Sequence, residues 1–219
     1  MAQWPFWQPF RRRRPATAFL GLGSNVGDRL ATLRVALRDL HEHDKVVVEA
    51  VSTVYETAPV MEDRIEFDDV QEPYLNLVAG VTTSLRPRAL LEVAHAVEAV
   101  HGRDREREPR WGPRTLDIDI LLYEDLTLDE VDLTIPHPRL TDRAFVLVPL
   151  TEVLPPGARL PNGSTIMSHL ARLAPVTRVD PYVRLVEGPG TGAEPLAHRP
   201  MGPIGGPPRL RPSQEGDER

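Results

Sequence analysis

Arg110-Trp-Gly-Pro-Arg-Thr-Leu-Asp-Ile-Asp-Ile-Leu121 is the stretch of this 219-residue chain that decides most about its fold and chemistry. Its second half alternates two aspartates with apolar residues, as a strand does, and side chains along a strand alternate between its faces. Asp117 and Asp119 therefore share one face, with α-carbons about 6.6 Å apart. The apolar residues predicted on the opposite face are Leu116, Ile118, Ile120 and Leu122. Two carboxylates at this spacing can close on a pair of metal ions about 3.5–4 Å apart.

An arginine-rich segment, residues 102–114, comes directly before this strand; its arginines are Arg103, Arg105, Arg107, Arg110 and Arg114. Transfer from a nucleoside triphosphate requires metal ions held beside mobile cations, because its catalysis is mostly positioning and neutralisation of phosphate charge. A solvated Asp-x-Asp on an edge strand is the plainer interpretation. However, Asp is disfavoured in strands, and like charges on one face repel unless a cation lies between them. The combination favours a phosphate-transfer site.

Composition narrows the chemistry further. The chain has no cysteine, which excludes disulfides, zinc-thiolate sites and cysteine nucleophiles. A metal ion would be a hard cation held by oxygen, and Mg²⁺ is the natural choice beside phosphates. The net charge of −6 argues against a general nucleic-acid binder. No apolar run approaches the ~18 residues that span a membrane, so we expect a cytoplasmic protein.

The hydrophobic pattern predicts the order strand, helix, strand, strand, helix, strand. Strands are expected at residues 16–22, 45–55, 74–84 and 115–123, and helices at 28–41 and 87–101. This order is that of the ferredoxin-like βαββαβ core, an α+β sandwich with an antiparallel sheet. A hairpin around residues 126–133, a proline-rich connection and a helix at about 165–173 follow, so we also expect a C-terminal helical addition.

One domain is expected, at residues 16–182. Residues 1–15 form an aromatic and basic extension, and residues 183–219 are rich in glycine and proline. Neither segment has the periodicity of a packed element, so both are predicted to be disordered.

Residues 21–27, Gly-Leu-Gly-Ser-Asn-Val-Gly, could be mistaken for a dinucleotide-binding loop, with Glu49 as the ribose-binding acid. The spacing is one residue too long for G-x-G-x-x-G, and the predicted strand continues past Glu49. A tight turn at residues 23–27, with Asp28 at the start of a helix, explains the glycines better.

The chain resembles the 6-hydroxymethyl-7,8-dihydropterin pyrophosphokinases, a family of folate-biosynthesis enzymes. The opening stretch matches the family signature at every fixed position. Further similar segments are residues 19–30, 55–59, 73–76 and 135–150, and the resemblance extends from about residue 17 to about residue 173. It implies a Mg²⁺-dependent diphosphotransferase that moves pyrophosphate from ATP to the hydroxymethyl pterin and releases AMP. Asp117 and Asp119 would hold two Mg²⁺ ions.

The same resemblance assigns the other site residues, each by its position. Tyr74 and Phe145 would be two plates that stack on the flat pterin ring. The full set of pterin-binding residues is Thr57, Pro59, Val60, Tyr74, Asn76, Trp111 and Phe145, with Ser24 and Asn25 at the edge of the pocket. ATP would contact Glu98, Arg114, Ile120, His137 and Arg143. The catalytic arginines would be Arg103, Arg105, Arg110 and Arg114. The expected partners are these two small molecules, with no nucleic acid and no membrane, and the protein is expected to be a monomer.

The chain departs from the family pattern at three places. Met61 stands where glycine is usual, and the loop after it is longer and more acidic. His95 stands where glutamine is common. The arginine-rich segment is one residue longer, so the role of each loop arginine stays open.

Two functions from other classes also stay open. A metal-dependent nucleotide-sugar transferase could use Asp-x-Asp, although such enzymes seldom fit so short a chain; its product would be a nucleoside diphosphate and not AMP. A non-catalytic pterin- or nucleotide-binding module would require the loss of a metal ligand, and both aspartates are present.

Overall fold

The computed structural model of this protein describes residues 14–59, 71–105, 107, 112–173 and 180–184. In chain order its elements are β1 (Ala16–Ser24), α1 (Arg29–Glu42), β2 (Val46–Val51), β3 (Thr53–Thr57), β4 (Tyr74–Thr83), α2 (Pro87–Val100), β5 (Asp117–Tyr123), β6 (Leu128–Glu130), β7 (Leu133–Ile135), the 3₁₀ turn η1 (Leu140–Asp142), α3 (Ala144–Val153), α4 (Ile166–Leu173) and β8 (Asp180–Arg184). None of the helices found in these residues is long and apolar enough to cross a bilayer.

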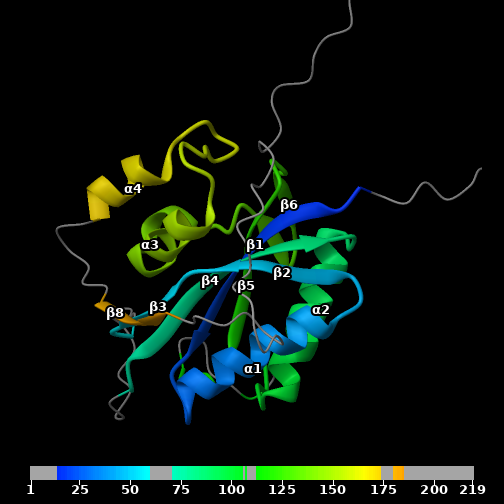
Figure 1. The fold of residues 1–219 in the computed structure, drawn as a ribbon, viewed down its shortest axis with the longest axis vertical. Coiled ribbons are helices and arrows are strands. Elements are labelled where there is room, and N and C mark those ends of the chain that lie inside the picture. Colours follow the sequence, from blue (N-terminus) through cyan, green and yellow to red (C-terminus); the bar gives the residue numbers. More distant parts are fainter. Residues whose placement is uncertain (1–13, 60–70, 106, 108–111, 174–179, 185–219) are drawn as a thin grey trace, which may run out of the picture.

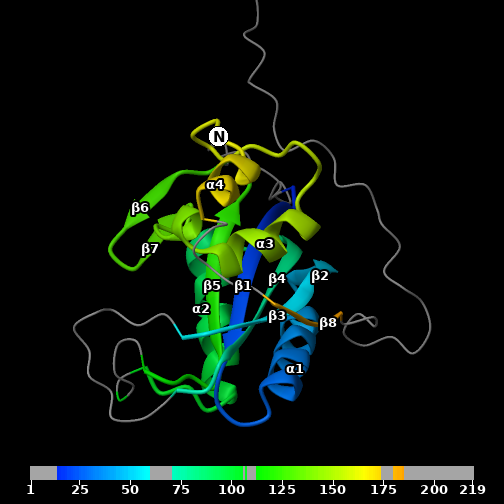
Figure 2. The same cartoon turned by 90° about the vertical axis from the view of Figure 1, so that its left-hand side faces the viewer.

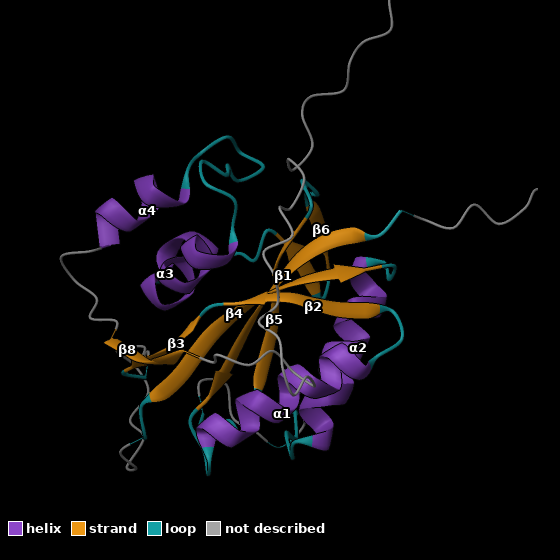
Figure 3. Ribbon diagram, in the orientation of Figure 1, coloured by secondary structure: helices purple, strands orange, loops and turns teal. Residues whose placement is uncertain are grey.

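The main sheet is antiparallel throughout and lies between two helical layers (Figures 1 and 3). Its strand order is β5-β1-β4-β3-β8, and β2 also pairs with β4. If β2 and β3 are taken as one broken strand, this is the strand order of a ferredoxin-like core. The predicted α+β fold class is therefore confirmed.

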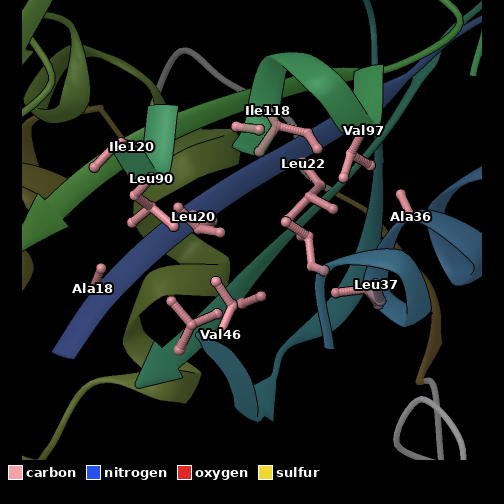
Figure 4. Close-up of a cluster of buried hydrophobic side chains, with 14 of the residues drawn as sticks. Ala18, Leu20, Leu22, Ala36, Leu37, Val46, Leu90, Val97, Ile118 and Ile120 are labelled. Carbon is pink, nitrogen blue, oxygen red and sulfur yellow. The ribbon is translucent and has the colours of Figure 1, made fainter. Parts of the chain in front are cut away.

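Helices α1 and α2 cover one face of the sheet, and their start signals are those read from the sequence. The Asp28 carboxylate accepts a hydrogen bond from the Ala31 amide at 3.0 Å and caps α1. Pro87 opens α2, where a missing N–H costs nothing. Figure 4 shows the core on this face, in which β1, β5 and both helices contribute side chains such as Leu20, Leu37, Leu90, Val97 and Ile118.

The predicted strand at residues 45–55 is wrong in one respect, because it is two strands that break at Ser52. The Ser52 hydroxyl accepts a hydrogen bond from the Val78 amide at 2.9 Å and donates to the Thr53 carbonyl at 2.8 Å. The Val78 N–H is thus bonded to a side-chain hydroxyl and not to a backbone carbonyl of the neighbouring strand, as it would be in a regular sheet. The second strand then continues to Thr57, at the edge of the site described below.

A bulge in β5 corrects the predicted position of Leu122. Leu20 pairs with Ile120 but Phe19 pairs with Leu122, so Leu121 is an extra residue. An extra residue reverses the alternation of faces beyond it. Leu122 therefore belongs to the core under α3 and not to the core with Ile118 and Ile120.

Helix α3 lies on the opposite face of the sheet, with α4 beside it (Figure 2). Helix α3 is not predicted from the sequence, where this region was expected to be a proline-rich connection. The segment is apolar on nearly every side, so it has no amphipathic period, and Pro149 lies inside it. It is stable as a helix because it is buried, between the sheet on one side and α4 on the other. Its N-terminal end contributes to the site.

Strand β8 pairs with β3 and extends two residues beyond the domain boundary predicted at residue 182. It covers the outer edge of β3, which would otherwise present unpaired backbone groups.

This pairing sharpens a prediction about the chain ends. Removing residues 1–14 and 188–219 together should leave activity and melting temperature close to those of the full chain, because neither segment has a pattern that buries a face. Ending the chain after residue 179 should instead lower the melting temperature by roughly 2–8 °C, because β3 then loses β8 and keeps only β4 as a partner strand. Differential scanning calorimetry on both truncated proteins decides this. A large loss of stability in the first truncation would show that an end docks on the domain.

Candidate active site

A pocket opens on the α3 face of the sheet, where the ends of the central strands meet the start of α3. The strands place alternate residues on this face, and α3 adds its first turn. Most of the residues that the sequence predicted for the site line this pocket: Thr57, Pro59, Tyr74, Asn76, Arg114, Asp117, Asp119, Arg143 and Phe145. Val60, Arg110, Trp111 and Met61 lie outside the described residues.

The apolar and hydrogen-bonding parts of the pocket lie side by side. Tyr74 and Phe145 both line it, one from β4 and one from α3. Between β3 and β4, the Asn76 amide donates to the Thr57 hydroxyl at 2.8 Å, and both side chains are buried. This bond uses one of the amide's two donor positions, so the amide has a second N–H to offer. The pocket can therefore take a flat ring with a polar edge.

Two glycines that were not predicted as site residues form part of the lining. A turn was expected from Gly23 onward, but β1 continues to Ser24, so Gly21 and Gly23 are strand residues on the pocket face. A β-carbon at Gly23 would lie 2.9 Å from Asn76 Oδ1 and 3.7 Å from Tyr74 Cδ1. Only glycine leaves this space free. The available signal was the alternation of the two glycines with Leu20 and Leu22.

Asp117 is held by two guanidinium groups. Its Oδ2 accepts a hydrogen bond from Arg114 at 2.7 Å, and its Oδ1 accepts one from Arg103. Burial would raise the pKa of Asp117, but Arg114 and Arg103 outweigh burial and hold that pKa below its ordinary value. Asp117 is therefore ionised at neutral pH.

Asp119 has a different environment on the same strand face. Burial, and next the charge of Asp117, raise the pKa of Asp119 to about 7. Its Oδ2 lies 3.7 Å from His137 Nε2. Burial and the nearby Arg143 lower the pKa of His137 to about 4, so the imidazole is neutral and does not offset the charge of Asp119.

The carboxylate pair fits a hard divalent cation. Its donors are oxygens, and an added cation would relieve the repulsion that raises the pKa of Asp119. Within the described ranges, no three His, Asp or Glu side chains are grouped so that they could hold a metal ion. A cation between Asp117 and Asp119 would therefore complete its coordination with water or with oxygens of a bound ligand, as Mg²⁺ commonly does beside phosphates.

Glu98, on α2, does not line the pocket but contacts two of the predicted catalytic arginines. Its side chain is 1% exposed and accepts hydrogen bonds from Arg103, from Arg105 Nε at 2.9 Å and from the Ile118 amide at 2.7 Å. Burial raises the pKa of Glu98, although the arginines act against this. The carboxylate thus connects α2, the arginine-rich segment and β5. Its predicted contact with a nucleotide stays a prediction.

The remaining predicted residues are placed as follows. The Arg143 guanidinium lies 5.5 Å from the centroid of the Phe145 ring, a cation–π contact at the start of α3. His137 donates its backbone N–H to the Leu121 carbonyl at 2.9 Å, which fixes it beside β5. Ile120 is buried in the core on the α1 and α2 face and does not line this pocket. Its contact with a nucleotide also stays a prediction.

Asn25 was predicted only at the edge of the pocket, but it connects three segments. Its Oδ1 accepts a hydrogen bond from the backbone N–H of Arg114 at 2.7 Å, and its Nδ2 donates one to the backbone carbonyl of Glu72 at 3.3 Å. It thus joins the end of β1 to the residues before β4 and before β5.

Comparison with known proteins agrees with this geometry. The model of the 7,8-dihydro-6-hydroxymethylpterin-pyrophosphokinase (HPPK) family matches residues 19–155. The 2-amino-4-hydroxy-6-hydroxymethyldihydropteridine pyrophosphokinase of Bacillus subtilis is 46% identical over 137 residues, which cover 62% of this chain and 77% of that protein. The protein of the same name from Methylorubrum extorquens is 42% identical over 158 residues, which cover 72% and 94%.

Solved structures show the same fold. An HPPK-DHPS protein in complex with substrates superposes with a TM-score of 0.55 at 16% identity, covering 73% of this chain and 43% of that one. A Plasmodium falciparum HPPK-DHPS triple mutant with pteroate gives a TM-score of 0.56 at 17% identity, covering 76% and 45%. This chain therefore spans less than half of those two-part proteins, and at such identities the likeness concerns the fold alone. From the family match and the close relatives, the resemblance seen in the sequence is confirmed: this chain belongs to the 7,8-dihydro-6-hydroxymethylpterin-pyrophosphokinase family.

Proposed function

We propose that this protein transfers pyrophosphate from ATP to 6-hydroxymethyl-7,8-dihydropterin and releases AMP, a step of tetrahydrofolate biosynthesis. The observation that carries the proposal is one pocket in a chain of this family that combines two aromatic side chains, a buried amide–hydroxyl pair and two carboxylates with their arginines. The ring-binding and charge-handling parts are adjacent, as transfer to a substituent of a flat ring requires.

The pterin would stack between Tyr74 and Phe145, with its polar edge toward Asn76 and Thr57. Offset stacking on an aromatic side chain buries the faces of the pterin ring and also fixes its orientation. The open lining at Gly23 leaves room for the ring between β1 and α3. In this pose the hydroxymethyl group would point toward Asp117 and Asp119.

Asp117 and Asp119 would hold two Mg²⁺ ions. When bound, these ions would supply Lewis-acid stabilisation of phosphate charge and would lower the pKa of the attacking hydroxyl. The protein contributes the carboxylates, the shape of the site and the exclusion of water. No side chain is proposed as a general base.

The arginines would neutralise phosphate charge as AMP departs. Arg103 and Arg114 already contact Asp117, so they stand at the site before the phosphates arrive. Bound phosphate oxygens would compete with Asp117 for these guanidinium groups. Arg143 and His137, with the loop residues Arg105 and Arg110, complete the proposed phosphate-contacting set.

Incubation of the purified protein with Mg-ATP and the hydroxymethyl pterin tests the proposal. We expect AMP and the pterin diphosphate in equal amounts, and no AMP when the pterin is left out. A nucleoside diphosphate as product would contradict the proposal and favour a sugar-transferase type of reaction. Pterin binding without any product would identify a binding module.

A second prediction concerns the two plates. Tyr74→Ala and Phe145→Ala should each weaken pterin binding, by roughly 1–3 kcal/mol by analogy with base–aromatic stacking. ATP affinity should change little, because the rings are proposed to contact only the pterin. Isothermal titration calorimetry with each ligand, on variants shown to be folded, separates the two effects. Equal losses for both ligands would mean that these rings support the fold and not the pterin.

A further inference from the structure

Tyr74 makes contacts of two kinds. Its ring lines the pocket, while its hydroxyl donates a hydrogen bond to the carbonyl of Gly112 at 3.1 Å. Gly112 is buried and lies near the end of the arginine-rich segment, shortly before β5. One side chain thus contacts both the ring-binding part of the site and the base of the loop.

The segment at residues 112–114 is held by Tyr74 of β4 and by Asn25, the residue after β1. Besides the bond from Tyr74, the backbone N–H of Asn25 donates to the Arg114 carbonyl at 3.0 Å, and Asn25 Oδ1 accepts a hydrogen bond from the backbone N–H of Arg114 at 2.7 Å. The Arg114 side chain then donates to Asp117 at 2.7 Å. The position of this backbone therefore determines where the Arg114 guanidinium meets the carboxylate.

The Tyr74 ring borders the open space beside Gly23. A β-carbon added at Gly23 would lie 3.7 Å from Tyr74 Cδ1, an ordinary contact distance, so glycine leaves this side of the ring free of side-chain atoms. Because a phenol is rigid, any shift of the ring also moves its hydroxyl. A ligand stacked on the ring would restrict that movement, and the Gly112 carbonyl would be held with it.

From these contacts we propose that the Tyr74 hydroxyl is a positioning group that couples occupancy of the ring pocket to the base of the arginine-rich loop. This inference rests on the proposed function, since it gives Arg114 the task of meeting phosphate charge. The hydroxyl itself need not touch either substrate. Its effect is on how well Arg114 is held in place during transfer, where small displacements of charged groups are costly.

Tyr74→Phe separates the hydroxyl from the ring. We expect the pterin dissociation constant to stay within about two-fold of wild type, because the plate is intact. The single-turnover rate should fall about three- to ten-fold, the range that the loss of one neutral hydrogen bond corresponds to. Amide hydrogen exchange at residues 112–116 should become faster in the free protein.

Tyr123→Phe is the matched control. Tyr123 also donates from its phenol to a backbone carbonyl, that of Leu85 at 2.5 Å, but it lies on the other face of the sheet and does not line the pocket. It should change neither the rate nor exchange at residues 112–116.

Three results would overturn the inference. They are an unchanged rate and unchanged exchange in Tyr74→Phe, a loss of pterin affinity that accounts for the whole loss of rate, and an equal loss of rate in Tyr123→Phe. The exchange measurement needs no substrate, so it tests the coupling to the loop even if the wild-type protein forms no AMP. Absence of AMP from the wild type would contradict the proposed function alone.

Discussion

Asp117→Ala and Asp119→Ala should each lower turnover by at least ~10³-fold while the protein stays folded. Loss of one ligand removes several kcal/mol of charge stabilisation from the transferring group, and each 1.36 kcal/mol corresponds to about ten-fold in rate. Both aspartates line the same pocket, so neither should compensate for the other. Steady-state production of AMP, with Mg²⁺ varied up to saturation, measures the loss.

The two variants should differ in stability although they agree in activity. Asp119 is a carboxylate whose pKa burial and Asp117 raise to about 7, so its removal should not lower the free energy of unfolding. Asp117 is the carboxylate that both Arg103 and Arg114 contact, and its removal should destabilise the protein. Urea denaturation at pH 7 distinguishes them.

Asp125→Ala is a suitable control, because Asp125 is an exposed acid in the turn after β5 and lies outside the pocket. It should keep wild-type turnover. If Asp117→Ala or Asp119→Ala retains more than about a tenth of the wild-type rate, these residues do not hold the metal ions.

Local patterns were sufficient to predict the central fold. Alternation along residues 115–123 placed Asp117 and Asp119 on one face, and the 3.6-residue period with Asp28 and Pro87 marked the starts of both long helices. These signals depend only on neighbours in the sequence. The sequence also predicts that Asp117 and Asp119 line one pocket, because residues two positions apart on a strand point to the same face.

Features that depend on distant partners were not predictable in this way. Helix α3 is apolar on most sides because the sheet and α4 enclose it, so its sequence carries no period. The bulge at Leu121 is visible only in the pairing of β5 with β1. Strand β8 exists through its pairing with β3, and its own sequence, Asp-Pro-Tyr-Val-Arg, is a weak strand signal.

In the candidate site, too, residue positions could be predicted from the sequence, but contacts between distant segments could not. The resemblance to the family supplied positions such as Tyr74 and Phe145, but it could not show what the side chains contact. Gly23 was assigned to a turn, since a glycine signals a turn more often than an open strand face. The role of Asn25 as a connection between three segments follows from contacts across 46 or more residues of sequence.

Arg103→Ala should slow transfer by two orders of magnitude or more yet bind Mg-ATP within a few-fold of wild type. The Arg103 side chain is only 5% exposed and contacts both Glu98 and Asp117, so it is already at the site in the free protein. Its loss removes a competitor for the Asp117 carboxylate, which should preserve binding of the metal–nucleotide complex. Charge that develops as AMP departs would then lack its counter-ion.

Arg105→Ala should also lower the transfer rate more than Mg-ATP affinity, but by a smaller factor. Arg105 is 43% exposed and contacts Glu98 but not Asp117. Arg107→Ala is the matched control from the same segment. Arg107 is 88% exposed and pairs with Asp104, so both its affinity and its rate should be those of wild type.

Nucleotide affinity and single-turnover rate, measured on the same three variants, decide between a catalytic segment and a solvated run of charge. A group that acts mainly in the transition state lowers the rate far more than it lowers ground-state affinity. Equal rates in all three variants would reduce the segment to a connector. A loss of Mg-ATP affinity as large as the loss of rate would instead make Arg103 a ground-state binding residue. The loss of rate should be largest for buried Arg103, smaller for half-exposed Arg105 and absent for exposed Arg107. We expect this order because a guanidinium group that is buried beside Asp117 lies where the phosphates are expected to bind.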